Sequence, residues 1–407
     1  MKSYRTMCKK TWAVILAIAC HLPATWATNA NEIEIIPKPI HVEQTSGNFR
    51  LSPKSTIGYD AALQGQAEYL QQVLGQSTGW DLKLKKDARK ATILLTLNPE
   101  KVDKPEGYRL DVTPKGISLT GRDAGGIFYG IQTLLQLFPP QVYSDKRQHG
   151  VEWIAPAVTI YDAPNRPWRG MMLDVARYFY DKEFVKKYID MMAMYKLNKL
   201  QFHLIDDSGW RLEIKKYPRL TEVGAWRVNR MDVPFYFRRN AEPGEPTPIG
   251  GFYTQEDIKE MVSYAADRQI EIIPEIDMPA HSNAALAAYP QLACPVVDSY
   301  IGVIPGLGGS NSGVIYCAGN DSAFTFLQDV LDEVMAIFPS RYIHLGGDEA
   351  QKGYWKKCPL CQQRIKKEHL ANEEDLQGYF MKRMSDYVRS KGREVIGWDE
   401  LTNSSFL

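Results

Sequence analysis

The chain has 407 residues, of which 44% are hydrophobic and 24% charged, and its 49 Lys and Arg residues nearly balance its 48 Asp and Glu residues. This balance argues against a nucleic-acid-binding protein, because such proteins gather an excess of basic residues on one face. The length suggests two or three domains of about 150 residues each, although one α/β barrel can use about 250 residues by itself.

Residues 1–27 have the pattern of a secretory signal peptide. Basic residues precede an apolar run from Trp12 to Ala19, and small residues follow up to Ala27. The run is too short to span a bilayer, which takes about 20 residues, and no later segment approaches that length without charge. We therefore expect an exported protein, periplasmic or extracellular, with no transmembrane segment in the mature chain. A lipoprotein anchored through Cys20 is the alternative.

Residues 32–162 predict a small α+β domain. Alternating or apolar runs at 91–97, 108–113 and 116–120 are typical of strands. The segment 123–137 predicts a helix that ends before Pro139 and Pro140. Its glycine-rich start lacks the lysine and the spacing of a phosphate-binding loop, so we assign these glycines to helix packing.

Residues 163–407 predict alternating strands and amphipathic helices, which indicate a parallel sheet with covered faces. Polar or aromatic residues follow every predicted strand, and this arrangement favours an α/β fold of the (β/α)8 TIM-barrel type over a doubly wound open sheet. The strands are expected at 170–175, 199–204, 270–277, 342–347 and 394–398, and the helices at 182–195, 254–268, 322–338 and 373–391.

The predicted barrel has about five βα units, whereas a closed barrel has eight. The chain ends at Leu407, shortly after the fifth strand. We therefore expect an incomplete barrel in a C-terminally truncated chain, with an unusual barrel as the alternative. A truncated chain of this kind is expected to be poorly active.

Four cysteines follow the predicted signal peptide: Cys294, Cys317, Cys358 and Cys361. An even number of cysteines in an exported protein indicates disulfide bonds, most simply Cys294 with Cys317 and Cys358 with Cys361. A zinc site is the alternative, although only Cys358 and Cys361 have the usual CxxC spacing of ligand pairs.

Asp348 and Glu349 form an acidic pair at the end of a predicted buried strand, in the sequence HLGGDE. Neighbouring carboxylates in one pocket favour the protonated form of one of them, as a general acid requires. A pair that caps a following helix is the alternative.

Polar and aromatic side chains also follow the other predicted strands. Read singly, Arg177 fits a structural ion pair, Asp206 and Asp207 a solvated turn, His281 a packing element and Trp398 a core residue. Their common position after parallel strands instead favours one site at the carboxyl edge of the sheet.

Five segments, in this order and spacing, resemble the glycoside hydrolase family 20 β-N-acetylhexosaminidases, and segments around residues 106–110 and 124–130 resemble the accessory N-terminal domain of that family. The five are RGMMLDVAR (169–177), NKLQFHLIDDSGWRLE (198–213), IPEIDMPAHS (273–282), HLGGDE (344–349) and IGWDE (396–400). The resemblance implies hydrolysis of terminal, non-reducing β-linked GlcNAc or GalNAc with retention of configuration. It implies a substrate-assisted mechanism with an oxazolinium intermediate and no metal or organic cofactor.

The resemblance also implies roles for individual residues. Glu349 would act as general acid and then general base, and Asp348 would orient the acetamido group. The expected substrate-binding and supporting residues are Arg177, Asp206, Asp207, His281 and Trp398, and the resemblance does not decide which of Asp206 and Asp207 supports Glu349. Partners would be oligosaccharides or glycoconjugates that contain N-acetylhexosamine, for example from chitin.

Two rival functions remain open on the sequence. One is a retaining glycosidase that uses two separated carboxylates, such as Glu275 and Glu349. The other is a non-catalytic carbohydrate-binding protein on a decayed barrel.

Overall fold

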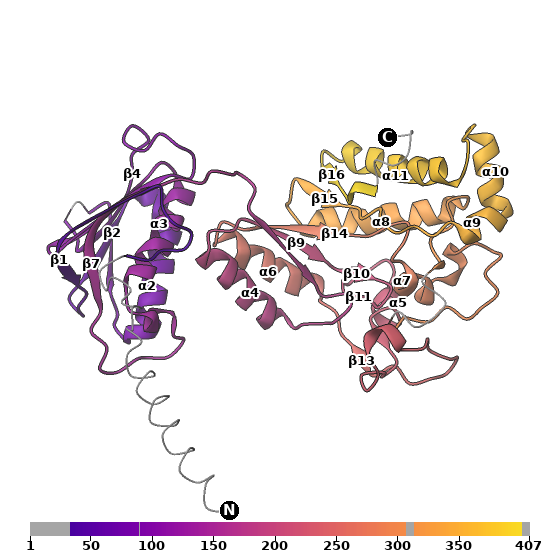
Figure 1. Ribbon diagram of the computed structural model, residues 1–407, viewed down its shortest axis with the longest axis horizontal. Coiled ribbons are helices and arrows are strands. Elements are labelled where there is room, and N and C mark those ends of the chain that lie inside the picture. The colour runs from indigo at the N-terminus through magenta and orange to yellow at the C-terminus, as the bar shows by residue number, and fades with distance from the viewer. Residues whose placement is uncertain (1–32, 89, 307–312, 401–407) are drawn as a thin grey trace, which may run out of the picture. The chain divides into compact units, whose positions relative to one another are not determined.

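The computed structural model describes residues 33–88, 90–306 and 313–400 (Figure 1). The predicted signal peptide and Cys20 lie outside the described residues. Within the described part of the chain, no helix combines the length and the apolar character needed to cross a membrane.

The N-terminal domain contains a seven-stranded mixed sheet with the strand order β1-β7-β5-β6-β4-β2-β3. Helices α2 and α3 lie along this sheet (Figure 1). The strands are β1 His41–Arg50, β2 Thr56–Tyr59, β3 Lys83–Lys86, β4 Ile93–Leu97, β5 Tyr108–Thr113, β6 Gly116–Gly121 and β7 Ile154–Asp162, and the helices are α2 Gln64–Thr78 and α3 Ala124–Leu137. The three strands and the helix predicted here are therefore confirmed.

The start of α3 shows why its glycines are needed. The Asp123 side chain caps the helix by accepting a hydrogen bond of 2.8 Å from the Gly126 amide. A Cβ atom on Gly126 would lie 2.1 Å from the carbonyl oxygen of Gly107, so only glycine fits. The assignment of these glycines to packing is confirmed.

The C-terminal domain contains a five-stranded parallel sheet in which strands that follow one another in the chain lie side by side, in the order β8-β9-β14-β15-β16. A doubly wound sheet reverses its strand order, so that alternative is wrong. The strands are β8 Gly170–Asp174, β9 Lys199–His203, β14 Glu271–Glu275, β15 Tyr342–His344 and β16 Glu394–Ile396. The main helices between them are α4 Lys182–Met194, α6 Gln255–Ala266, α8 Asp321–Ile337 and α11 Glu373–Ser390, as predicted.

The carboxyl ends of the five parallel strands are in register. The last residue of each strand is paired with the last residue of its neighbour, in the series Asp174, His203, Glu275, His344 and Ile396. Because side chains at paired positions project to the same face, the first four of these residues form a row of polar groups at this edge of the sheet, and Ile396 ends the row with an apolar side chain.

Long connections follow β9, β14 and β15. The first contains β10 Ile205–Asp206, β11 Gly209–Trp210, α5 Arg219–Glu222, β12 Trp226–Arg227, the 3-10 helix η3 Phe235–Phe237 and β13 Ile249–Gly250. The second contains α7 Asn283–Ala288 and η4 Pro290–Leu292, and the third contains α9 Gly353–Lys357 and α10 Pro359–Lys367.

The buried side chain of Arg211 links the connections after β8 and β9 by hydrogen bonds. Its side chain is fully buried and donates hydrogen bonds to backbone carbonyl oxygens, at 3.0 Å to Val175, 2.7 Å to Ala176 and 2.6 Å to Ala225. These bonds satisfy carbonyl groups of irregular backbone that would otherwise be buried without partners. Arg211 therefore fixes the backbone directly before Arg177.

We predict that Arg211→Met lowers the free energy of unfolding by about 3 kcal/mol or more, because several buried carbonyl groups lose a charged donor. Urea unfolding followed by circular dichroism measures the change. The control is Arg389→Met, an exposed residue of α11 whose loss should cost less than about 0.5 kcal/mol. Equal unfolding midpoints for the two variants would contradict the role given to Arg211.

Candidate active site

A cavity of about 410 Å³ lies at the carboxyl end of the parallel strands. Five of the residues singled out in the sequence line it: Arg177, Asp206, Asp207, His281 and Glu349. Asp348 and Trp398 are not among its lining residues: Asp348 lies 3.5 Å from His281, and Trp398 donates a hydrogen bond to buried Glu275. The volume is in the range of small-ligand pockets, which is about 300–1,000 Å³.

Further lining residues come from the connections after the strands and were not singled out in the sequence: Ser208, Phe235, Tyr236, Ala280, Ile304 and Gln351. Tyr236 and its neighbour Phe237 expose 70% and 76% of their surface. Three consecutive aromatic residues in a segment otherwise rich in proline, glycine and charge are the sequence signal that could have identified this rim.

His203, the last residue of β9, forms the buried centre of the polar row. Its Nε2 lies 2.9 Å from Asp206 Oδ2, and its Nδ1 forms an ion pair of 3.0 Å with Glu275 Oε2 that is not aligned as a hydrogen bond. Burial alone would lower the pKa of His203, but Asp206 and Glu275 outweigh it and raise this pKa well above its usual value. His203 is thus an imidazolium between two carboxylates.

Glu275 is completely buried and is held on several sides. It accepts hydrogen bonds of 2.7 Å from Gln201 and 3.0 Å from the indole of Trp398. Burial would raise the pKa of Glu275, but protonated His203 lowers it. A carboxylate in this position supports the site and is poorly placed to attack a sugar, which disfavours Glu275 as the nucleophile of a two-carboxylate mechanism.

His281 lies between two pairs of acids. Its Nδ1 is 3.5 Å from Asp206 and 3.6 Å from Asp207, and its Nε2 is 3.5 Å from Asp348 and 3.6 Å from Glu349. Neither nitrogen has a hydrogen bond of good geometry. Burial opposes its charge, but the surrounding carboxylates raise the pKa of His281 far above its usual value. His281 thus connects the aspartate pair with Asp348 and Glu349 in one polar cluster, and the roles expected of these residues stay predictions.

The two adjacent aspartates have different environments. Burial would raise the pKa of Asp206, but His203 and His281 lower it, so that Asp206 is ionised. Asp207 accepts a hydrogen bond of 3.0 Å from the Asn283 amide, and burial raises its pKa. Asp206 is therefore the carboxylate that carries the charge between the two histidines.

Asp348 and Glu349 lie on a turn that only glycine allows. Gly346 has φ +66°, and a Cβ atom there would lie 1.7 Å from Asp277 Oδ1. The Gly347 amide donates to the same oxygen at 3.2 Å, and burial raises the pKa of Asp277 well above its usual value. Because helix α9 begins only at Gly353 and has Lys352 as its N-cap, the helix-capping alternative for the acidic pair is wrong.

The side chains of Asp348 and Glu349 differ in how much of their surface is exposed. The Glu349 side chain is 73% exposed, whereas that of Asp348 is 20% exposed. Glu349 itself has φ +47°, a left-handed backbone conformation that residues other than glycine rarely adopt. The Glu349 carboxyl group is thus exposed at the cavity, whereas that of Asp348 is mostly covered.

Arg177 is anchored by two carboxylates. Its guanidinium forms ion pairs of 2.7 Å with Asp174 and 2.8 Å with Asp206. The structural ion pair considered from the sequence is therefore present. The side chain is also 36% exposed and lines the cavity, so its remaining N–H groups can meet a ligand.

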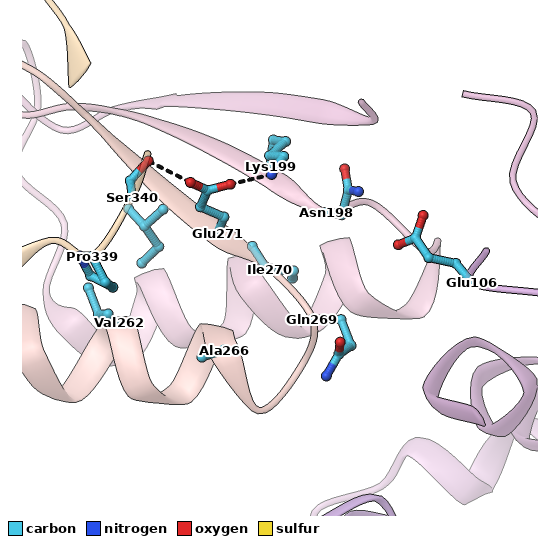
Figure 2. A pocket seen from close by; sticks show the side chains of 11 residues that line it. Glu106, Asn198, Lys199, Val262, Ala266, Gln269, Ile270, Glu271, Pro339 and Ser340 are labelled. Carbon is cyan, nitrogen blue, oxygen red and sulfur yellow. Dashed lines mark hydrogen bonds and ion pairs between the residues drawn. The ribbon is translucent and has the colours of Figure 1, made fainter. Parts of the chain in front are cut away.

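A second pocket, of about 380 Å³, lies at the opposite, amino-terminal end of the strands (Figure 2). Its most prominent charge, Glu271, accepts a hydrogen bond of 2.7 Å from Ser340 and is paired with Lys199. The charge of Glu271 is neutralised by Lys199 within the fold. We therefore assign the groups around this pocket to stabilisation of the sheet and not to ligand binding.

The predicted disulfide bonds are not present in this structure. Cys294, Cys317, Cys358 and Cys361 are all free thiols. The closest sulfur contacts, 3.7 Å for Cys294 with Cys361 and for Cys317 with Cys358 and Cys361, are too long for a covalent bond of about 2.05 Å.

Comparison with protein families gives two matches. A model described as the catalytic domain of glycosyl hydrolase family 20 matches residues 167–406. A model described as domain 2 of the same family matches residues 32–163. Together they cover both sheets of the structure.

Individual proteins show the same likeness. A β-hexosaminidase of Porphyromonas gingivalis is 42% identical over 372 residues, which are 91% of this chain and 45% of that protein. A β-hexosaminidase of Vibrio furnissii is 38% identical over 377 residues, which are 92% and 58% of the two proteins. The chain therefore spans about half the length of these curated relatives.

The crystal structure of a β-N-acetylhexosaminidase from Bacteroides fragilis superposes with a TM-score of 0.74 at 38% identity, and covers 91% of this chain and 67% of its own. The fold is thus that of an α/β barrel domain preceded by an N-terminal domain.

The raised pKa of His281 predicts a pH dependence of stability. The folded protein keeps this proton, whereas an unfolded histidine loses it above about pH 6.5, so the contribution is complete below about pH 6.5 and declines at higher pH. The free energy of unfolding of the unsubstituted protein, relative to His281→Gln, should fall by up to about 1.4 kcal/mol per pH unit above that point.

Chemical unfolding between about pH 6 and pH 9 measures this slope. His149→Gln, at an exposed position of the N-terminal domain, is the matched control and should follow the unsubstituted protein throughout. A constant difference between the unsubstituted protein and His281→Gln over this range would show that His281 is not protonated in the fold.

Proposed function

The chain belongs to glycosyl hydrolase family 20, and from this premise we propose that it is a β-N-acetylhexosaminidase that removes terminal, non-reducing β-linked GlcNAc or GalNAc. The observation that carries the proposal is the acidic pair Asp348 and Glu349, of which Glu349 is exposed at the cavity and Asp348 mostly covered, both beside protonated His281. Related proteins are named β-hexosaminidases and support this activity. We also propose that the sheet belongs to a (β/α)8 barrel.

The proposed reaction uses the acetamido group of the substrate as nucleophile. Its carbonyl oxygen attacks C1 while the glycosidic C1–O bond breaks, and Glu349 gives its proton to the departing oxygen. An oxazolinium ion results. Glu349, now a carboxylate, takes a proton from water, and the oxygen of that water attacks C1, which restores the acetamido group with retained configuration.

Asp348 and His281 support the two states of Glu349. Asp348, which is partly exposed beside Glu349, would accept a hydrogen bond from the acetamido N–H and balance the positive charge of the oxazolinium ion. The imidazolium of His281 lies 3.6 Å from Glu349 and stabilises the carboxylate that forms when Glu349 has given up its proton. Its own charge is held by Asp206 at 3.5 Å on the other side.

We propose binding roles for Arg177 and Trp398. The N–H groups of Arg177 that are not used by Asp174 and Asp206 would bind outer hydroxyl groups of the sugar. The indole of Trp398 is fixed by its hydrogen bond to Glu275, and its ring would wall the acetamido pocket.

We further propose that the protein is exported to the periplasm or the cell exterior. The support is the basic, apolar and small-residue pattern of residues 1–27.

We predict that Glu349→Gln lowers kcat for 4-nitrophenyl N-acetyl-β-glucosaminide about 10²- to 10⁴-fold, because general acid catalysis contributes about this much. Release of 4-nitrophenol measures it. Glu374→Gln, an exposed residue of α11 paired with Lys352, is the control and should keep the rate. An unchanged rate in Glu349→Gln would contradict the proposed acid.

The same assay separates the mechanisms. The substrate-assisted route requires the 2-acetamido group, so 4-nitrophenyl β-glucoside should not be hydrolysed and a thiazoline analogue should inhibit. A covalent adduct of a fluorosugar on Glu275 would establish the two-carboxylate mechanism instead. Binding of GlcNAc by folded protein without turnover would favour the carbohydrate-binding protein.

We predict that Arg177→Lys lowers kcat/KM about 10- to 100-fold, because a lysine cannot hold Asp174 and Asp206 and also meet two hydroxyl groups. Initial rates over a range of substrate concentration measure the change. Arg389→Met again serves as control. An unaltered kcat/KM in Arg177→Lys would contradict the binding role and show that Arg177 serves only in its structural ion pairs.

A further inference from the structure

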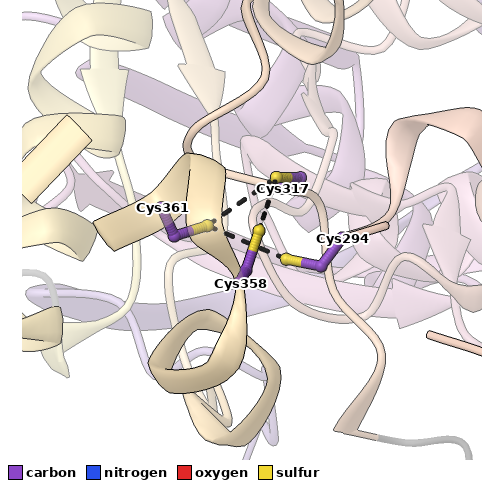
Figure 3. Close-up of side chains that lie close together, drawn as sticks. All are labelled: Cys294, Cys317, Cys358 and Cys361. Atoms are coloured by element: carbon purple, nitrogen blue, oxygen red, sulfur yellow. Dashed lines mark hydrogen bonds between the residues drawn. The ribbon is translucent and has the colours of Figure 1, made fainter. Parts of the chain in front are cut away.

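Four buried cysteines from three separate parts of the C-terminal domain converge at one point (Figure 3). Cys294 follows η4, Cys317 precedes α8, and Cys358 and Cys361 belong to the start of α10. Each is at most 2% exposed. We call these four residues the cysteine cluster.

The spacing of the sulfurs is that of a tetrathiolate metal site. All four Sγ atoms lie within 4.8 Å of one another, and three of the contacts are 3.7 Å. The centre of a tetrahedron with such edges is about 2.3 Å from each corner, which is the usual Zn–S distance.

The backbone brings these sulfurs together without help from a covalent bond. An isolated bridge pairs Ala293 with Tyr316, and the Cys317 amide donates to Leu292 at 2.9 Å, so that Cys294 and Cys317 lie on adjoining backbone. A Cβ atom on Gly319 would lie 2.2 Å from the carbonyl carbon of Leu360, so the glycine lets the first turn of α10 approach.

We propose that the cysteine cluster is a structural site for one Zn²⁺ ion, with Cys294, Cys317, Cys358 and Cys361 as its four ligands. Thiolate ligands in a tetrahedron select zinc over hard cations such as Mg²⁺ or Ca²⁺. Four protein ligands leave no position for water or substrate, so the ion would stabilise the fold and take no part in the reaction. Each thiol loses its proton when the metal binds.

The metal would fasten two of the connections that form the cavity. Beside Cys317, the Tyr316 amide donates to the carbonyl of Pro279 at 3.1 Å, two residues before His281. Ahead of Cys358, the indole of Trp355 donates to the carbonyl of Tyr316 at 2.9 Å, on the connection that carries Glu349. Metal bound at the cysteine cluster would hold both connections in place. This proposal does not depend on the proposed hydrolase activity.

Metal analysis of the full chain tests the proposal directly. We expect one equivalent of zinc per chain in protein purified without chelators, and loss of most of it in Cys361→Ser. The control is Arg389→Met, an exposed residue of α11 outside the cluster, which should keep its zinc.

Cobalt substitution gives a readout that needs no variant. Reduced, metal-free protein titrated with Co²⁺ should develop the intense thiolate charge-transfer and tetrahedral ligand-field absorption, saturate at one equivalent and lose it when zinc is added. A protein without metal whose intact mass is lower by the four hydrogens that two disulfides lose would overturn the proposal. Four titratable free thiols in folded protein that bind neither metal would also overturn it.

Discussion

The buried imidazolium of His203 fixes the carboxyl edge of the parallel sheet. It is paired with Asp206 at 2.9 Å and with Glu275 at 3.0 Å. All three side chains are buried, so water cannot take the place of a missing partner. Buried charges persist only when they are paired, so the three positions depend on one another. The register of β9 with β14, which sets His203 opposite Glu275, brings the pair into contact.

A second group of charged residues, around His281, packs against the group formed by His203, Asp206 and Glu275. Asp206, held by His203, faces His281, and His281 faces Asp348 and Glu349. Negative and positive groups alternate from the interior of the sheet to the open cavity. The last group of this chain, Glu349, is the only one of these that is mostly exposed. The arrangement leaves one carboxyl group where a ligand can reach it and buries the charged groups beside it.

Much of this could be predicted from the sequence. Periodicity located the five parallel strands and their helices, because amphipathic helices and buried strands carry strong local signals. The positions of Arg177, Asp206, Asp207, His281 and Glu349 around one cavity followed from their places after those strands. Family resemblance, and not periodicity, supplied the chemistry.

Other features depend on contacts between distant segments and give no local signal. The role of His203 depends on register with Glu275, and that of Arg211 on irregular backbone far along the chain. Sequence spacing suggested that Cys358 pairs with Cys361, but folding places the sulfurs of Cys294 and Cys317 beside them. Three separate segments therefore contribute the four sulfurs, which spacing along the sequence does not reveal.

The aromatic rim at Phe235, Tyr236 and Phe237 is built differently from the charge network beside it. Tyr236 and Phe237 are exposed by more than two thirds, and substitutions at such exposed positions usually change stability by less than about 0.5 kcal/mol. The buried acids and histidines have no such freedom. Substitutions in this rim can therefore change the entrance of the cavity at little cost in stability, while the buried acids and histidines beside it stay the same.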